Sequence, residues 1–171
     1  LVTVNKKYIN DNELKQICQF RSKARIPVLV WKHLDGDQTL WRCSQPKSGM
    51  NKNRCIEDET LLKIISKLNS KNKQLIIFDA RPKINAVGNR MAGKGYENTD
   101  FYKNCQIRFM NIENIHVIRN SYARLRKACN NTDNERSFLS EVSSSQWLNH
   151  CSYILEAVYE MVQAIDRDKA S

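Results

Sequence analysis

Glycine and proline are scarce in this sequence, and long apolar runs are missing. The 171 residues include five glycines and three prolines, which excludes a collagen repeat and a low-complexity chain. Apolar runs such as 28–31 are only a few residues long, far from the roughly 18 apolar residues that a membrane-spanning helix needs. The chain opens with no charged leader, no long apolar core and no initiator methionine. We therefore expect a piece of a longer protein, without a secretory signal.

Closely spaced cysteine pairs are missing as well. The six cysteines stand at positions 18, 43, 55, 105, 129 and 151, and none forms a Cys-x-x-Cys pair. Structural zinc sites are commonly built from such pairs, so we expect no zinc site of that kind. Cys18, Cys129 and Cys151 fall on the apolar faces of expected helices, which indicates reduced core thiols in a cytosolic protein.

Positive charge is what the sequence has in excess. Lys and Arg number 28 against 18 Asp and Glu, which gives a formal net charge of +10. Such an excess favours a polyanionic partner: nucleic acid, an anionic membrane surface or a phosphorylated substrate. A solvated basic surface with no specific ligand would carry the same charge, so the choice among these depends on other features.

The pattern of elements predicts one α/β domain. No internal repeat and no linker rich in Gly, Ser or Pro divides the sequence. Expected strands cover 1–5, 26–31, 39–43, 75–78 and 106–110, and the apolar runs at 26–31 and 75–78 are typical of strands buried on both faces. An expected helix opens with the capping box Asn10-Asp11-Asn12-Glu13, and others cover 57–68, 114–129 and 145–167. Strands that alternate with helices favour a mixed central sheet flanked by helices, with loops at 44–56 and 130–137.

Three of the expected helices carry apolar stripes that need a surface to cover them. The stripe of 57–68 consists of Leu61, Leu62, Ile65 and Leu68. The stripe of 114–129 consists of Ile115, Ile118, Tyr122, Leu125 and Cys129. The stripe of 145–167 consists of Trp147, Cys151, Ile154, Val158, Val162 and Ile165.

Polar residues follow two of the expected strands, at 79–81 and at 111–114. Ligands of α/β proteins bind beyond the carboxyl ends of the strands, so this crevice is where we expect chemistry. The cations of 81–94, which are Arg81, Lys83, Arg90 and Lys94, suit a phosphate, although an ordinary solvated turn fits the same residues. The segment 88–94 matches the first seven places of a P-loop, but Gly95 lacks the hydroxyl that binds the metal, which argues against nucleotide binding.

A basic α/β chain with a phosphate crevice suggests a cysteine phosphatase. That chemistry needs a thiolate nucleophile with an arginine at the sixth place after it. None of the six cysteines has one, because those places hold Ala24, Gly49, Leu61, Asn111, Glu135 and Ala157. The string His150-Cys151-Ser152 begins like such a loop but continues as the interior of an expected helix.

Six ordered blocks of sequence nevertheless resemble the phosphatase domain of the myotubularins, from about residue 2 to the end. They are 20–29 (FRSKARIPVL), 42–46 (RCSQP), 79–86 (DARPKINA), 93–98 (GKGYEN), 113–117 (ENIHV) and 147–150 (WLNH). The resemblance implies a cysteine-phosphatase-like fold. It implies an enzyme that removes the 3-phosphate of phosphatidylinositol 3-phosphate and 3,5-bisphosphate through a cysteinyl-phosphate intermediate, with no cofactor and no metal. It also implies that residues 1–171 are the N-terminal and middle part of that domain. The fold is then incomplete at both ends, and both the family's N-terminal lipid-binding domain and its Cys-x5-Arg loop lie outside the chain.

The resemblance also implies site residues and partners. Asn89 and Asn114 match asparagines that bind the phosphoinositide headgroup, while a turn residue and a helix N-cap are the simpler readings of the two. Arg81 and His116 are second candidates that hold the crevice in shape. The implied partners are the headgroup, an anionic membrane surface and other family members in homo- or hetero-oligomers. The implied location is cytoplasmic and peripheral to membranes, with endosomal membranes favoured.

Two alternatives stay open. The first is a catalytically inactive pseudophosphatase or adaptor of the same family, which binds the headgroup or an active partner without turnover. The second is a basic nucleic-acid-binding module. It rests on net charge alone and lacks the interleaved aromatics and clustered basic helix that are typical of one, so we expect no nucleic-acid partner.

Overall fold

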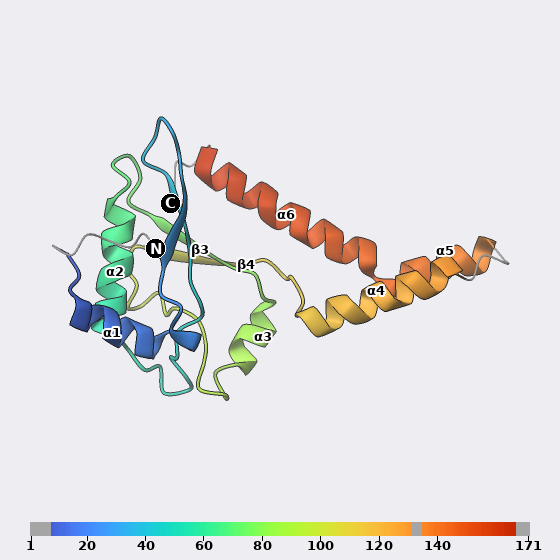
Figure 1. The fold of residues 1–171 in the computed structure, drawn as a ribbon, viewed down its shortest axis with the longest axis horizontal. Helices are drawn as coiled ribbons and strands as arrows, with labels where there is room; N and C mark the ends of the chain where they lie inside the picture. Colours follow the sequence, from blue (N-terminus) through green and yellow to red (C-terminus); the bar gives the residue numbers. More distant parts are fainter. Residues whose placement is uncertain (1–7, 131–134, 167–171) are drawn as a thin grey trace.

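The structure is a computed structural model that describes residues 8–130 and 135–166, shown in Figure 1. The first half holds α1 (Asp11–Phe20), the 3-10 helix η1 (Ser22–Ala24), β1 (Val28–Lys32), β2 (Thr39–Arg42) and α2 (Ile56–Lys67). The second half holds β3 (Leu75–Asp79), α3 (Lys83–Gly88), β4 (Cys105–Phe109), α4 (Ile115–Asn130), α5 (Glu135–Ser145) and α6 (Trp147–Asp166). The expected strand at 1–5 lies outside the described residues.

The α/β class is confirmed, with both kinds of strand pairing. β1 and β2 pair antiparallel around the turn at 33–38, with an irregularity between Leu29 and Trp31. β3 and β4 pair parallel in register from Leu75 opposite Cys105 to Asp79 opposite Phe109. The described strands thus form two sheets of two strands each rather than one continuous sheet. In the described part of the chain, β3 has a strand partner on one edge only.

The capping-box prediction for α1 is confirmed in detail. The side chain of Asn10 accepts hydrogen bonds from the backbone N–H of Asn12 and Glu13, and Glu13 accepts one from the backbone N–H of Asn10. These bonds satisfy amides that would otherwise lack a partner at the first turn. The helix then buries Ile17 in a core shared with α2 and the start of β3, whose buried members are Ile9, Ile17, Leu61, Leu62, Ile65, Leu75 and Tyr102.

Two predictions of burial are wrong. β1 is not buried on both faces, because Val30 and Trp31 are 54% and 42% exposed in a sheet that has two strands among the described residues. Leu68 is 46% exposed, because α2 ends at Lys67 and Leu68 is its C-cap. For β3, Leu75 and Ile76 are buried but Ile77 and Phe78 are half-buried, so the prediction of a fully buried strand holds only for its first half.

Helices α4, α5 and α6 form an arm that leaves the sheets and returns to them (Figure 1). The expected helix at 145–167 is confirmed as α6, Trp147–Asp166. Residues 135–145 form α5, a helix that was not predicted, so the expected loop at 130–137 extends too far. The hydroxyl of Ser121 on α4 donates a buried 2.7 Å bond to the carbonyl of Ser145, at the end of α5. α6 then brings Ala164 against Ile76 and Phe78 of β3.

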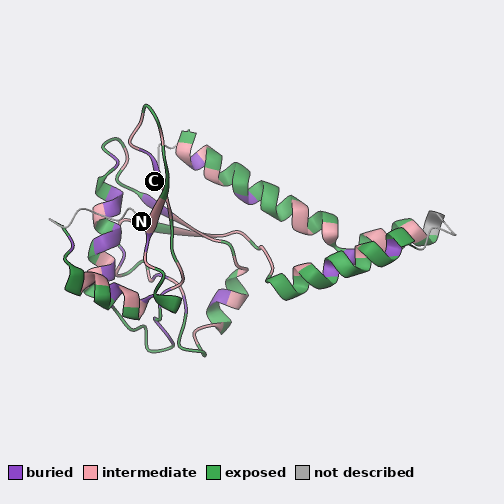
Figure 2. Cartoon of the chain, viewed as in Figure 1, coloured by how far each residue is buried: buried purple, intermediate pink, exposed green. Residues whose placement is uncertain are grey.

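The apolar stripes of this arm, expected to need a covering surface, are only partly covered among the described residues. Figure 2 shows α6 mostly exposed, and Ile154, Val158 and Val162 are 43%, 52% and 52% exposed. On α4, Ile115 and Tyr122 are also exposed, and Cys129 is an exposed thiol. Cys18 and Cys151 are half-buried, so the three cysteines expected in the core are not in it. No helix within the described residues is long and apolar enough to cross a membrane.

Candidate functional site

A crevice of about 630 Å³ opens at the carboxyl end of β3. One wall is the end of β3 and the residues after it, and the opposite wall comes from η1 and from the segment 43–45 that follows β2. The cations that line it come from four segments and are Lys23, Arg25, Lys47, Arg81 and Lys94. Its two lining acids, Asp79 and Glu97, are each ion-paired with an arginine, so the unpaired charge at the crevice is positive.

Arg81 lies in this crevice, where it joins three segments. Its Nε and Nη2 donate to both carboxylate oxygens of Asp79 at 2.9 and 2.5 Å, and its Nη1 donates to Oε1 of Gln45 at 2.5 Å. A further bond of 2.9 Å runs from Nη2 to the carbonyl oxygen of Gly95. Every nitrogen of the guanidinium therefore has an acceptor, and the geometry fits a residue that holds the crevice walls together.

Asn114 caps α4. Its Oδ1 accepts hydrogen bonds from the backbone N–H of His116 at 2.9 Å and of Val117 at 3.2 Å. An N-cap asparagine uses only its oxygen for this purpose. The amide nitrogen of Asn114 has no acceptor among the described residues, so it can donate to a ligand while the oxygen caps the helix. Substrate binding by Asn114 stays a prediction.

Asn89 lies at the other end of a helix. It is the C-cap of α3, and its carbonyl oxygen accepts from the backbone N–H of Ala92 at 3.1 Å and of Lys94 at 3.0 Å. Its half-buried side chain has no hydrogen-bond partner within the described part of the chain. His116 is exposed in the first turn of α4, and the structure assigns its ring no partner in that same part. The roles of Asn89 and His116 also stay predictions.

The four predicted residues do not all line one crevice. Among the described residues that line it, only Arg81 comes from this set. Asn89 and Asn114 instead occupy the ends of α3 and α4, which a weak 3.5 Å bond from Asn85 to Glu113 connects. The prediction placed them in the strand-end crevice because both follow strands, but the short helix α3 and the cap of α4 place them beside it.

A buried ionic network behind the crevice was missed by the sequence analysis. Arg21, fully buried at the end of α1, donates through Nε and Nη2 to both oxygens of Asp58 on α2, at 2.7 and 2.6 Å. Its Nη1 donates to Glu97 at 2.5 Å and to the carbonyl of Ser44 at 2.9 Å. The hydroxyl of Tyr102 completes the network with a 2.7 Å bond to Asp58.

The network fixes one side of the crevice by electrostatics. Burial alone would lower the pKa of Arg21, but the carboxylates of Glu97 and Asp58 hold that pKa well above its usual range. Burial, and then the nearby charge of Asp58, raise the pKa of the Tyr102 hydroxyl, so it remains a hydrogen-bond donor. Sequence spacing gave no signal for this network because Arg21 lies 37 residues from Asp58 and 76 from Glu97.

Two cysteines near the network, Cys105 and Cys55, are poor nucleophiles. Burial, reinforced by the charges of Glu97 and Asp58, raises the pKa of Cys105 to about 12. Burial also raises the pKa of Cys55 to about 11. Because the thiolate is the reactive form, neither thiol is activated. Across 8–130 and 135–166, no group of three or more His, Cys, Asp and Glu side chains is placed to hold a metal ion.

Comparison with known proteins identifies the class of this domain. A family model described as a myotubularin-like phosphatase domain matches residues 2–171, which is nearly the whole sequence. The sequence is thus that of a phosphatase-domain segment, and the chain belongs to the myotubularin family.

Curated relatives agree. The chain is 46% identical over 154 residues to the human phosphatidylinositol-3,5-bisphosphate 3-phosphatase MTMR8, which covers 90% of this chain and 22% of the relative. It is 46% identical over 155 residues to human phosphatidylinositol-3,5-bisphosphate 3-phosphatase MTMR6, with 90% and 25% covered. It is 39% identical over 162 residues to Xenopus laevis myotubularin, with 95% and 27% covered. The chain therefore spans about a quarter of the length of these relatives.

Proposed function

We propose that this chain supplies the N-terminal and middle part of the catalytic domain of a phosphoinositide 3-phosphatase. Its substrates would be phosphatidylinositol 3-phosphate and 3,5-bisphosphate. The observation that carries the proposal is the family match over 2–171, together with relatives named as phosphatidylinositol-3,5-bisphosphate 3-phosphatases. The basic crevice at the carboxyl end of β3 supports it, because it can attract a phosphorylated headgroup.

The reaction of the intact protein would proceed in two displacements. A cysteine thiolate attacks the 3-phosphorus, the bond from phosphorus to the inositol oxygen breaks, and that oxygen takes a proton. Water then attacks the cysteinyl phosphate and releases inorganic phosphate with the thiolate restored. The nucleophile and its arginine would lie outside residues 1–171, because none of the six cysteines here has an arginine six places later.

Within this scheme the chain would hold and orient the headgroup. The amide nitrogen of Asn114 and the side chain of Asn89 would donate to inositol hydroxyls or phosphate oxygens, which binds the headgroup without burying a charge. Arg81, saturated by Asp79, Gln45 and Gly95, would keep the crevice in shape, and His116 would do so from the start of α4. The intact protein would work at the cytosolic surface of endosomal membranes, where it could assemble with family members.

Phosphate release tests this proposal. A longer protein that carries this chain and an intact Cys-x5-Arg loop is expected to release phosphate from soluble short-chain phosphatidylinositol 3-phosphate. The 171-residue chain alone is expected to show no turnover, because binding without covalent chemistry supplies little rate. Headgroup binding without turnover by a longer protein would identify the pseudophosphatase alternative instead.

Asn114 can be tested without disturbing its helix. Asn114→Ser keeps an oxygen that caps α4 but removes the amide donor, whereas Asn114→Ala removes both. If Asn114 binds the headgroup, both variants raise the KM for the phosphoinositide and leave turnover of a small artificial phosphate ester nearly unchanged. One lost hydrogen bond corresponds to about 0.5–1.5 kcal/mol, or up to about 3 kcal/mol with a charged partner. A normal KM in both variants would show that Asn114 is only a cap.

A further inference from the structure

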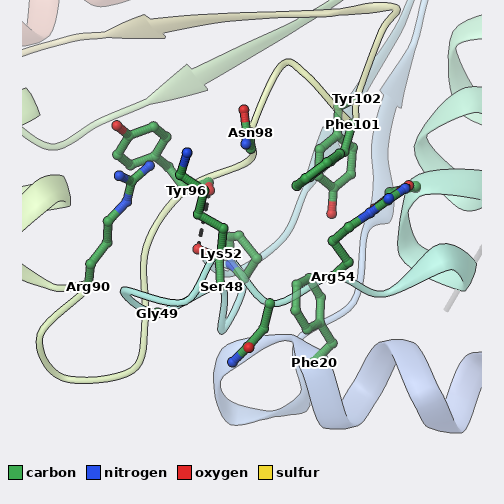
Figure 3. Close-up of a pocket in the computed structure, with 13 residues that line it drawn as sticks. Phe20, Ser48, Gly49, Lys52, Arg54, Arg90, Tyr96, Asn98, Phe101 and Tyr102 are labelled. Carbon is green, nitrogen blue, oxygen red and sulfur yellow. Dashed lines mark hydrogen bonds and ion pairs between the residues drawn. The ribbon is translucent and has the colours of Figure 1, made fainter.

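Two surface loops are joined backbone to backbone at one end of the molecule. The loops are 47–54, which precedes α2, and 89–95, which follows α3. The backbone N–H of Gly49 donates to the carbonyl of Lys94 at 3.0 Å, and the hydroxyl of Ser48 donates to the carbonyl of Tyr96 at 3.4 Å. Gly49 and Gly93 both have positive φ, 59° and 70°, which lets the loops pass closely. Figure 3 shows the two loops side by side.

Large apolar side chains project from this end into solvent. Met91 is 85% exposed, Ile84 on α3 is 78% exposed, and Met50 is 66% exposed. Figure 2 shows these loops mostly exposed, at the end of the molecule opposite the tip of the β1–β2 hairpin. Isolated exposed apolar residues are ordinary, but here three come from adjacent segments.

The same segments carry only positive charge. Neither 44–56 nor 80–96 contains an Asp or Glu. Lys52, Lys83 and Arg90 line one open concavity of about 580 Å³, and in the described part of the chain none of the three forms an ion pair. Lys52 and Arg90 both extend toward Tyr96 (Figure 3), whose ring lies 4.2 Å from the Arg90 guanidinium carbon. The buried Nε of Arg90 has no hydrogen-bond partner among residues 8–130 and 135–166.

We propose that loops 47–54 and 89–95, with α3, dock on an anionic lipid bilayer. The cations would lie at the level of the lipid phosphates, and Met50 and Met91 would insert into the interface. Lys47 and Lys94, one from each loop, also line the crevice at the end of β3, so this docking directs the crevice toward the membrane. The inference rests on the proposed function in that a phosphoinositide substrate lies in such a bilayer.

Flotation with vesicles tests the docking. The full chain, its monomeric state checked by gel filtration, is mixed with phosphatidylcholine vesicles with and without phosphatidylserine, and no phosphoinositide is present. The chain is expected to bind only the phosphatidylserine vesicles, and less as salt is raised. Met50→Ser with Met91→Ser should weaken binding about tenfold or more, whereas Leu34→Ser, at the 97% exposed tip of the β1–β2 hairpin, should not.

The basic residues of this surface can also be tested with matched control variants. Lys52→Asn with Lys83→Gln should weaken binding about 30-fold, at about 1 kcal/mol per cation, and asparagine suits the positive φ of Lys52, 52°. Lys71→Gln with Lys73→Gln, between α2 and β3, should change it little. Met91→Trp should strengthen binding, because tryptophan favours the membrane interface, and misfolding cannot produce such a gain.

Each remaining outcome overturns the docking. Unchanged binding by the methionine variants, or equal loss in the control variants, would mean that the loops are not the contact. Binding of a DNA duplex that depends on the lysines but not the methionines would assign the surface to nucleic acid. The test is separate from catalysis: failure of phosphate release from the soluble short-chain lipid would refute the proposed function and leave vesicle binding intact.

Discussion

Replacing Arg21 by methionine is expected to destabilise the fold severely. Methionine keeps an apolar stem of similar length but removes the charge and every N–H donor of the guanidinium. Asp58 and Glu97, 0% and 5% exposed, would then be buried without their cationic partner. Removing one partner of a buried ion pair costs about 3–5 kcal/mol, against a total stability of about 5–15 kcal/mol for an ordinary domain.

Arg54 provides the matched control for this loss. It makes the same two-pronged contact, with Nε and Nη2 at 2.9 and 2.8 Å from the oxygens of Glu59, but its side chain is 48% exposed. Its guanidinium carbon also lies 4.0 Å from the centre of the Phe101 ring. Exposed ion pairs and exposed cation–π contacts contribute little because water screens them, so Arg54→Met is expected to lower the unfolding free energy far less than Arg21→Met does.

Urea unfolding, followed by tryptophan fluorescence and far-UV circular dichroism, measures both losses. A third variant separates charge from packing: Arg21→Met combined with Asp58→Asn and Glu97→Gln removes the stranded carboxylates. It is expected to recover a substantial part of the loss. Equal midpoints for Arg21→Met and Arg54→Met would refute the argument that burial makes this network costly to break. A triple variant no more stable than Arg21→Met would show that packing, not charge, is what is lost.

Three further predictions concern single features. Tyr102→Phe removes a 2.7 Å bond to the charged Asp58 and should lower the unfolding free energy by about 1.5–3 kcal/mol, so an unchanged urea midpoint would contradict it. Burial raises the pKa of Cys105 to about 12, so iodoacetamide at pH 8 should alkylate it more slowly than the exposed Cys129, by about a hundredfold or more. Similar alkylation rates for the two cysteines would contradict this prediction. Ile154, Val158 and Val162, on the exposed stripe of α6, can each be replaced by glutamine. The replacements should raise solubility and change the unfolding free energy by only about 0.5 kcal/mol per site. A loss of several kcal/mol would mean that another part of the protein covers the stripe.

Elements with a local signal could be predicted from the sequence. The capping box at Asn10 and the positions of the strands β2, β3 and β4 all follow from neighbouring residues. Asn114 belongs to the same group, since an asparagine before an apolar run is a typical N-cap. The family was equally accessible, because its motifs are contiguous blocks and the match over 2–171 confirms it.

Features that depend on distant residues could not be predicted. The partners of Arg21 come from α2 and from the segment after α3, and nothing in the local sequence separates this arginine from the exposed Lys23 and Arg25 nearby. The backbone hydrogen bond from Gly49 to Lys94 likewise joins positions 45 residues apart in the sequence. It is made by backbone atoms, so no pattern of side chains predicts it. The short helix α3 was missed because Pro82 and the glycines around it indicate a loop.

The apolar stripes of α4 and α6 show why the sequence predicted these helices correctly but did not predict which of their side chains are buried. A step of three and four residues identifies one face of a helix but says nothing about whether another element lies against it. In the described structure the most buried positions of these helices are small residues, Ser121 and Ala128 on α4 and Ala157 and Ala164 on α6. Small side chains allow close approach, and Ala164 meets β3 where the large residues of the stripe do not. On this arm the small residues mark the closest approach of a neighbour, whereas several large apolar residues, among them Ile154, Val158 and Val162, lie on the surface.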